Sequence, residues 1–198
     1  MTEHSRYNVG GQEDGGVLKN KLNINDQKTL EDAETILFSD AYKYFFGLLE
    51  KGKLKFDVKF IFQIHKYSLE TLYQWAGKIR TVEISKGGVL FCASSQIEKA
   101  LKEFEKILSQ NMPASIDAKD IIIEKLAIIH CEFNAIHPFR EGNGRTIRLF
   151  IDLLVVSHGF NPIDYAKSSQ HDYIKACIRG MSKDYSQMQE VILKGLSK

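Results

Sequence analysis

Twelve residues in the second half of the chain, HPFREGNGRTIR (137–148), combine groups that could carry out phosphate chemistry. His137 is a base whose ordinary pKa lies near neutral pH, and Glu141 is a carboxylate that can bind a metal ion. Gly142 and Gly144 carry no side chain, so backbone N–H groups there can approach an anion closely. The stretch therefore predicts a site that holds phosphate beside a proton acceptor.

Helices on both sides of this stretch would position its groups. An apolar helical pattern covers about 117–136, and Pro138 disfavours helical geometry at the residue before it, so the helix should end at His137. A second helix should begin near residue 142 or 143 and run to about 158. Gly159 is its expected C-terminal stop. The loop between the two helices would carry the chemistry.

The start of the second helix gives this loop positive charge. Its unpaired backbone N–H groups suit phosphate, and the side-chain amide of Asn143 can donate as well. Arg145 and Arg148 lie three residues apart and share a helix face, where their guanidinium groups can bind further phosphates. Glu141 fits if Mg²⁺ bridges it to those phosphates, and His137 can then take a proton from an attacking hydroxyl. A structural turn with solvated arginines is the alternative interpretation.

The whole chain has ordinary globular properties. It has 198 residues, 43% of them hydrophobic, and a formal net charge of +2, which favours a single domain and no nucleic acid or membrane binding. Three cysteines without a CxxC pair indicate a reducing compartment, and the N-terminus lacks the apolar segment of a signal peptide. We therefore expect a cytoplasmic protein. The most apolar segment, LFIDLLVV, is interrupted by Asp152 and predicts a buried helix.

Helical periodicity and capping residues predict an all-α bundle with one small β-hairpin. Asp26 is the expected N-cap of the first long helix, and Ser95-x-x-Glu98 reads as a capping box. Alternating apolar residues around a Gly-Gly turn predict the hairpin at 84–91. Helices are expected over about 26–49, 57–68, 69–75, 95–109, 117–136, 142–158, 168–180 and 184–195.

The 137–148 stretch matches the Fic motif HPFx[D/E]GNGRxxR at every defined position. The chain resembles the Fic family over most of its length, including GVLKNKL at 16–22 and the stretch 64–88. The resemblance implies a Fic domain at 17–198 behind a flexible tail at 1–16. It also implies a Fic-type helical bundle, with the hairpin forming a flap beside the active-site loop.

The resemblance assigns a role to each motif residue. His137 would be the general base, Phe139 a structural anchor in the core, and Glu141 the Mg²⁺ ligand. Asn143 would contact the α-phosphate of ATP, and Arg140 fills the variable position. The ATP phosphates would be bound by Gly142, Asn143, Gly144, Arg145 and Arg148.

Two further regions are implied by the same resemblance. The exposed edge of the flap, with Lys86, Gly87 and Gly88, would pair with an extended segment of the target protein; a plain surface hairpin is the alternative. Tyr173 would line an adenine pocket, although a tyrosine on an amphipathic helix is more often a packing residue.

Fic proteins are mostly protein adenylyltransferases, which use ATP and Mg²⁺ to place AMP on a Ser, Thr or Tyr hydroxyl. The resemblance implies that activity for this chain, in a bacterial toxin restrained by a small antitoxin whose glutamate pairs with Arg148. The stretch Ser186–Glu190 matches part of the family's inhibitory motif but lies in the expected last core helix, so we interpret it as chance. Type II topoisomerase subunits are one candidate class of target, and small GTPases another.

Three other functions remain open at this stage. A Doc-like phosphotransferase would transfer the γ-phosphate instead, but such motifs carry lysine where this chain has Gly144. A non-catalytic adaptor with the Fic fold is opposed by the intact His137 and Glu141. A phosphodiesterase that removes AMP would use an internal inhibitory glutamate, which the sequence does not show.

Overall fold

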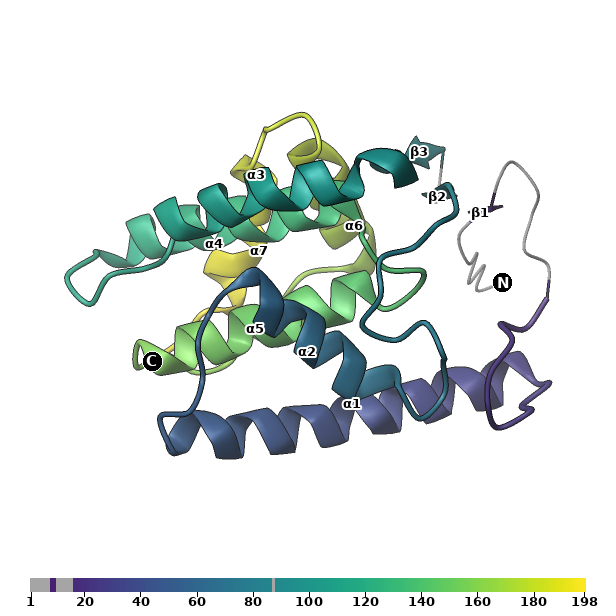
Figure 1. The fold of residues 1–198 in the computed structure, drawn as a ribbon. Coiled ribbons are helices and arrows are strands. Elements are labelled where there is room, and N and C mark those ends of the chain that lie inside the picture. The colour runs from purple at the N-terminus through teal and green to yellow at the C-terminus, as the bar shows by residue number, and fades with distance from the viewer. Residues whose placement is uncertain (1–7, 10–15, 87) are drawn as a thin grey trace.

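The computed structural model describes residues 8–9, 16–86 and 88–198, and Figure 1 shows their arrangement. The helices within these residues are α1 Gln27–Glu50, α2 Val58–Leu69, α3 Ile97–Gln110, α4 Lys119–Ile136, α5 Asn143–Ser157, α6 Gln170–Gly180 and α7 Ser186–Gly195. Short 3₁₀ helices cover Ser94–Gln96 and Tyr165–Lys167. The strands are β1 Asn8–Val9, β2 Ile84–Lys86 and β3 Val89–Leu90. The all-α bundle with a small sheet is confirmed.

α4 and α5 form the centre of the bundle. α4 packs against α3, α5, α6 and α7, whereas α5 also contacts α1 and α2. The C-terminal end of α4, the N-terminal end of α5 and strands β2 and β3 lie at the same end of the molecule (Figure 1). A backbone hydrogen bond from Cys92 to Ala135 ties the segment after β3 to the last turn of α4. The loop 137–142 therefore lies next to the sheet.

The apolar segment LFIDLLVV lies within α5, and its first seven residues are buried. Asp152 is buried with them because both of its carboxylate oxygens accept hydrogen bonds. One accepts from the Tyr42 hydroxyl at 2.7 Å and the other from the Ile163 N–H at 3.0 Å. A buried carboxylate is tolerated when it is hydrogen-bonded in this way. The polar residue that interrupts the apolar run thus connects α5 to α1 and to the segment after α5.

A second, smaller core fixes α1 against the connection that follows α2. Its buried members come from the segment before α1, from α1 itself, and from the end of α2 and the turns after it: Leu18, Leu30, Phe38, Leu69, Leu72, Tyr73 and Ala76. This cluster holds α1 at the end of the bundle where α5 begins. None of the helices within the described residues is long and apolar enough to cross a membrane.

The small sheet has three strands in the order β1-β2-β3. β2 and β3 form the expected hairpin, and β1 pairs antiparallel with β2, with Asn8 opposite Ser85 and Val9 opposite Ile84. β1 thus pairs with one edge of the hairpin, and β3 is the outer strand on the other side. The expected pairing of the flap's exposed edge with a target segment stays a prediction. Gly87 lies outside the described residues.

Two local expectations are wrong. Residues 70–77 form turns instead of a helix at 69–75, because the main chain there makes tertiary bonds: Lys21 N–H donates to Leu72 O at 2.7 Å. No capping box forms at Ser95, and α3 begins at Ile97 after a 3₁₀ turn. The hydroxyl and N–H of Ser94 bond the carboxylate of Glu83 instead, so a residue from another segment fixes this turn.

Candidate active site

His137 ends α4 in a left-handed conformation, with φ 48° and ψ 61°. Its Nδ1 bonds the carbonyl of Asn134 at 2.5 Å, which places the proton of the neutral ring on Nδ1 and leaves Nε2 as the basic nitrogen. The ring stacks on Phe91, with centroids 3.7 Å apart. Burial lowers the pKa of His137 to about 3, so the free ring is neutral at pH 7.

Arg80 supports the left-handed backbone at His137, a role that no pattern in the sequence indicates. Its Nε donates to the His137 carbonyl at 2.8 Å, and its own N–H donates to the Pro138 carbonyl at 2.8 Å. The other guanidinium nitrogens reach the carbonyls of Val82 and Cys92, on either side of the hairpin. One buried arginine thus joins the active-site loop to the flap. A lone arginine before the hairpin carries no pattern that would have revealed it.

The ring of Phe139 is fully buried and stacks on His65, with centroids 3.7 Å apart. His65 accepts from the N–H of Gly77 at 2.8 Å through Nδ1, so its Nε2 carries the proton and donates to Glu141 O at 2.9 Å. Burial lowers the pKa of His65 to about 4, which keeps this tautomer neutral. His65 on α2 thus fixes the position of the loop through its hydrogen bond to Glu141 O and its stacking on Phe139.

The side chain of Asn143 closes the loop on itself. Its Oδ1 accepts from the N–H of Phe139 at 2.9 Å, and its Nδ2 donates to the carbonyl of Phe139 at 2.8 Å. The residue is fully buried. The expected donation from this amide to the α-phosphate differs from its observed use, which is to hold the turn between α4 and α5.

The two loop glycines have different reasons to be glycine. Gly142 has φ +81°, and an added Cβ would come within 2.9 Å of the Leu69 side chain. Gly144 lies inside the first turn of α5, and an added Cβ would meet nothing nearer than the Tyr173 hydroxyl at 4.0 Å. Packing therefore requires glycine at 142 but not at 144. No side chain of the described residues caps α5, so the N–H groups near Gly144 remain available to an anion.

Glu141 lies in the loop two residues before the start of α5, and its side chain is partly exposed. Its Oε1 accepts from the N–H of Gly142 at 2.8 Å and lies 3.8 Å from the Arg145 guanidinium, and the side chain is 18% exposed. Among the described residues no three His, Cys, Asp or Glu side chains gather into a metal-binding group. A Mg²⁺ ion here would bind Glu141 and complete its shell with phosphate oxygens and water, which is its usual preference.

The two motif arginines are held differently. Arg145 forms an ion pair with Glu34 of α1 at 2.6 Å, and its guanidinium carbon lies 4.7 Å from the centroid of the Phe38 ring. Arg148 makes no ion pair with any residue that the structure describes. Its guanidinium carbon lies 5.5 Å and 5.4 Å from the ring centroids of Tyr165 and Tyr173, within range of a cation–π interaction.

Tyr173 of α6 lies beside the phosphate loop. Its hydroxyl hydrogen-bonds Nε2 of His130 at 2.9 Å, and Nδ1 of His130 lies 3.3 Å from the Asn134 amide nitrogen. Burial lowers the pKa of His130 to about 3. The tyrosine thus packs between Gly144, Arg148 and the buried end of α4, and these contacts account for its position.

The flap residues lie close to the base. Lys86 ends β2, and its charge contributes to the lowered pKa of His137. Gly88 has φ +77° at the hairpin turn, a conformation that glycine adopts easily. Leu90 of β3 is 68% exposed beside them. Flap and base are thus neighbours, although the third expected flap residue, Gly87, is not described.

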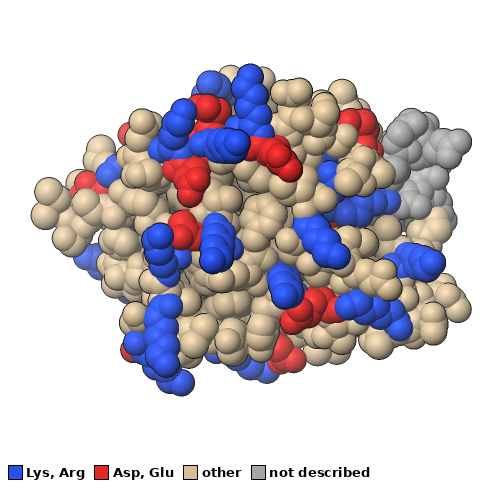
Figure 2. Space-filling model, in the orientation of Figure 1, with Lys and Arg blue, Asp and Glu red and all other residues tan. Residues whose placement is uncertain are grey.

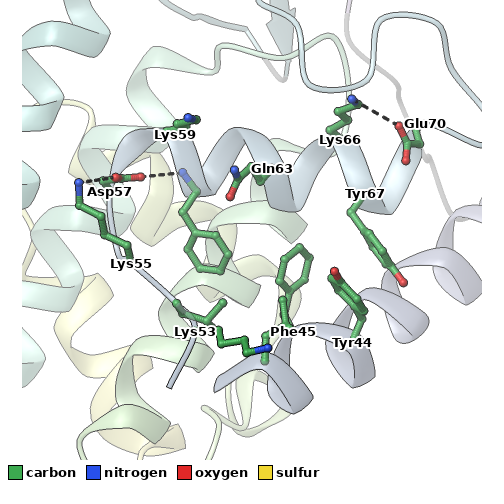
Figure 3. Close-up of a pocket in the computed structure, with 13 residues that line it drawn as sticks. Tyr44, Phe45, Lys53, Lys55, Asp57, Lys59, Gln63, Lys66, Tyr67 and Glu70 are labelled. Carbon is green, nitrogen blue, oxygen red and sulfur yellow. Dashed lines mark hydrogen bonds and ion pairs between the residues drawn. The ribbon is translucent and has the colours of Figure 1, made fainter. Parts of the chain in front are cut away.

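The surface is hollowed beside the first turns of α5 and, separately, between α1 and α2. One hollow of about 340 Å³ opens beside both arginines and is lined by Phe38, Tyr42, Arg145, Arg148, Asp152, Pro162, Ile163 and Tyr165. A larger one, of about 600 Å³, lies between α1 and α2, where the rings of Tyr44 and Tyr67 stack with centroids 4.3 Å apart (Figure 3). It contains no residue of the 137–148 loop, whereas Arg145 and Arg148 of that loop line the smaller hollow.

Surface charge is mixed on the face shown in Figure 2. Lys and Arg side chains there alternate with Asp and Glu over the described residues and do not gather into one basic patch. Extended basic patches are the usual sign of nucleic acid binding. The positive charge that the loop needs comes instead from two arginines on one helix.

Comparison with known proteins agrees with the resemblance of the 137–148 stretch to the Fic motif. The sequence model of the Fic/DOC family matches residues 55–155 of the 198, which include the whole loop and the flap. The chain belongs to the Fic/DOC family. It is 32% identical to a probable protein adenylyltransferase, y4lH, of Sinorhizobium fredii, over 85% of each chain.

Other relatives extend this result. The chain is 33% identical to protein adenylyltransferase VbhT of Bartonella schoenbuchensis over 92% of its own length, which is 37% of that longer protein. The Fic domain of Bep8 from Bartonella sp. 1-1C has the same fold, with a TM-score of 0.75, 24% identity and 89% of each chain covered. BepC of Bartonella tribocorum, solved with bound AMPPNP, has a TM-score of 0.76 at 24% identity, with 92% of this chain and 94% of that one covered.

Proposed function

We propose that this chain is a protein adenylyltransferase, which transfers AMP from ATP to a Ser, Thr or Tyr hydroxyl of a target protein. One observation carries the proposal: a single loop places a neutral, buried histidine next to an uncapped helix start with two arginines. Relatives that match most of this chain are named as protein adenylyltransferases. Binding of ATP is thus the role of the loop, and proton transfer the role of His137.

The reaction needs a base, a cradle and a leaving group. The target hydroxyl attacks the α-phosphorus, His137 Nε2 takes its proton, and the bond from the α-phosphorus to the bridging oxygen breaks. The products are an AMP ester of the target and pyrophosphate. The N–H groups at the start of α5 hold the α-phosphate, where the missing side chain of Gly144 leaves room. Arg145 and Arg148 hold the β- and γ-phosphates.

The low pKa of His137 suits this role only after ATP binds. A pKa of about 3 keeps the ring unprotonated but makes it a weak base. Negative phosphates near a histidine favour its protonated form and raise its pKa. Bound nucleotide would therefore make His137 a stronger base than it is in the free protein.

Glu141 is the residue that would hold Mg²⁺, because it is partly exposed and lies beside the anion cradle. The metal, when bound, neutralises charge that develops on the leaving pyrophosphate. Glu141 also anchors the loop, since its carboxylate bonds the Gly142 N–H and its carbonyl accepts from His65.

The target segment docks on the flap as an additional strand, near Lys86 and Gly88. β1 already pairs with the outer edge of β2, so an extended target segment either displaces β1 or pairs with the free edge of β3. Either arrangement carries a hydroxyl toward His137, because Phe91, which follows β3, stacks on that ring.

Inhibition of the site would come from a separate small antitoxin. The stretch Ser186–Glu190, which matches part of the family's inhibitory pattern, lies in α7, whose Met188, Val191 and Ile192 are buried against the core. A helix used for packing in this way is not free to cover the loop. A glutamate from a partner would pair with Arg148, for which the described residues provide no ion pair, and block the γ-phosphate.

Two labels on ATP test the proposal. The purified chain is incubated with a bacterial lysate, Mg²⁺ and ATP labelled at the α- or the γ-phosphate, with His137→Ala as control. Transfer of AMP predicts label in protein from the α position only, lost in the variant. Label from the γ position only would show Doc-like phosphoryl transfer and contradict the proposal.

A further inference from the structure

Glu34 is the buried acid of α1, with 2% of its surface exposed. Other acids on the same helix lie at the surface, where Asp32 and Asp40 have side chains 65% and 57% exposed. Removing a carboxylate from water is costly unless partners compensate its charge and its lone pairs. The position of Glu34 therefore needs an explanation beyond helix formation.

Both oxygens of Glu34 have described partners. Oε2 forms the 2.6 Å ion pair with Nη2 of Arg145, which lies 111 residues later in the chain. Oε1 accepts from the hydroxyl of Tyr73, in the turns that follow α2. Three separate segments thus converge on one carboxylate, and the second core holds two of them together.

These contacts fix the guanidinium of Arg145 from the side of α1. Glu34 holds one terminal nitrogen, and the ring of Phe38, one turn further along α1, packs at 4.7 Å from the guanidinium carbon. An arginine has five N–H donors in a rigid planar fork. Nη2, the nitrogen that Glu34 holds, also lies 3.8 Å from Oε1 of Glu141. With Nη2 fixed, the remaining donors of the fork point in set directions.

We propose that Glu34, itself oriented by Tyr73, is a positioning residue that aims Arg145 at a phosphate of the bound nucleotide. The inference rests on the proposed function, since it assumes that nucleotide phosphates lie over the start of α5. It adds to the family motif an acid and a tyrosine that lie well outside it. A purely structural role, in which the pair only ties α1 to α5, makes different predictions.

Replacement of Glu34 by glutamine is the sharpest change. The amide keeps the size of the side chain and one acceptor, but it loses the charge that fixes Arg145. We expect Glu34→Gln to weaken binding of Mg²⁺·ADP by roughly tenfold, because a pre-organised arginine loses less freedom on binding. Tyr73→Phe keeps the ion pair and removes one hydrogen bond, so its effect should be about two- to threefold.

Isothermal titration of Mg²⁺·ADP, at a temperature well below each variant's unfolding transition, measures the effect. Asp32→Asn is the matched control, because it neutralises an exposed acid two residues away that pairs only with Lys28 among the described residues. It should bind like the wild type. In an Arg145→Gln background, Glu34→Gln should cause no further loss, and that double variant leaves no buried charge unpaired.

Each outcome decides something. Unchanged affinity in Glu34→Gln, with a lowered unfolding temperature, would contradict a positioning role and leave a structural tie. Tighter binding would also contradict it, because Glu34 would then compete with phosphate for Arg145. If the wild type itself binds no nucleotide, the proposed function fails together with this inference, whereas wild-type binding with an unaffected variant overturns the inference alone.

Discussion

The two ends of the 137–148 loop differ in how deeply their functional side chains are buried and in the charge that those side chains carry. At the base end, the rings of His137, His65 and His130 are buried and uncharged, because burial lowers the pKa of each ring. The phosphate end, residues 142–148, is charged and only partly covered. The side chain of Arg145 is 26% exposed and ion-paired, and Arg148 lies between tyrosine rings.

This difference follows from what each end must do. A proton acceptor has to be unprotonated before substrate arrives, and burial achieves this without a counter-charge. A phosphate site must keep its positive charge, so its arginines are supported by aromatic faces and by one carboxylate. Changes at the base end should therefore affect chemistry and stability, and changes at the phosphate end should affect binding.

The largest effect is expected at the base end. His137→Ala removes the proton acceptor, so the rate of AMP transfer should fall by about 10²- to 10⁴-fold. Transfer is measured with α-labelled ATP in an excess of lysate protein. A variant that keeps the wild-type rate would show that another group takes the proton.

At the phosphate end, Arg148→Ala should weaken binding of Mg²⁺·AMPPNP, an ATP analogue that keeps the γ-phosphate assigned to Arg148. A hydrogen bond to a charged group contributes about 1.5–3 kcal/mol, or roughly 10- to 100-fold in affinity. Its rate of transfer at saturating ATP should change less than its apparent affinity does. Steady-state kinetics over a range of ATP concentrations separates the two. If affinity is unaffected, Arg148 holds no phosphate.

The acid stability of the protein should reflect the base end. A histidine with a folded pKa below its ordinary value near 6.5 stabilises the fold above that pH, and the contribution is lost as the pH falls toward the folded pKa. Each such ring lowers the free energy of unfolding by up to about 1.4 kcal/mol for each pH unit below 6.5. Asp152 has the opposite effect, because burial raises its pKa to about 6. Its protonation below pH 6 therefore offsets the loss of stability caused by one of the three histidines.

The free energy of unfolding should thus fall by up to about 3 kcal/mol for each pH unit below 6. Urea titrations at several pH values between 7 and 5 measure it. A free energy that stays constant over that range would contradict the neutral, buried state of these rings.

The smallest effects come from a matched pair of glycines. Gly142→Ala places a side chain at φ +81° and against Leu69, so it should destabilise the protein by about 1–3 kcal/mol. Gly144→Ala lies inside α5 and should stabilise it by up to about 1 kcal/mol while weakening nucleotide binding. Thermal unfolding and ADP titration of both variants check this. Equal destabilisation of the two variants would show that Gly144 also has a packing role.

Much of the fold was predictable from the sequence, because its signals are local. Pro138 predicted that α4 ends at His137, Asp26 predicted the start of α1, and Gly159 predicted the end of α5. Each is a propensity or a cap that acts within one turn. The expected helix at 69–75 is wrong because a contact from Lys21, some fifty residues earlier, overrides the local pattern.

The supports of the site were not predictable for the same reason. The motif residues stand next to one another in the sequence, but Arg80, His65 and Glu34 reach the loop from other elements. A lone arginine, histidine or glutamate on an ordinary segment has no period or spacing that indicates its partner. The occupant of the β2 edge, β1, is only two residues long and was invisible as a strand.

The most direct test compares the two ends in one assay. Isothermal titration of Mg²⁺·AMPPNP, a non-hydrolysable ATP analogue that keeps the γ-phosphate, is carried out side by side on the wild type, His137→Ala and Arg148→Ala. Separation of chemistry from binding predicts that His137→Ala keeps the wild-type affinity to within about threefold, whereas Arg148→Ala loses roughly 10- to 100-fold. Equal losses in the two variants, or a loss in His137→Ala alone, would contradict the account.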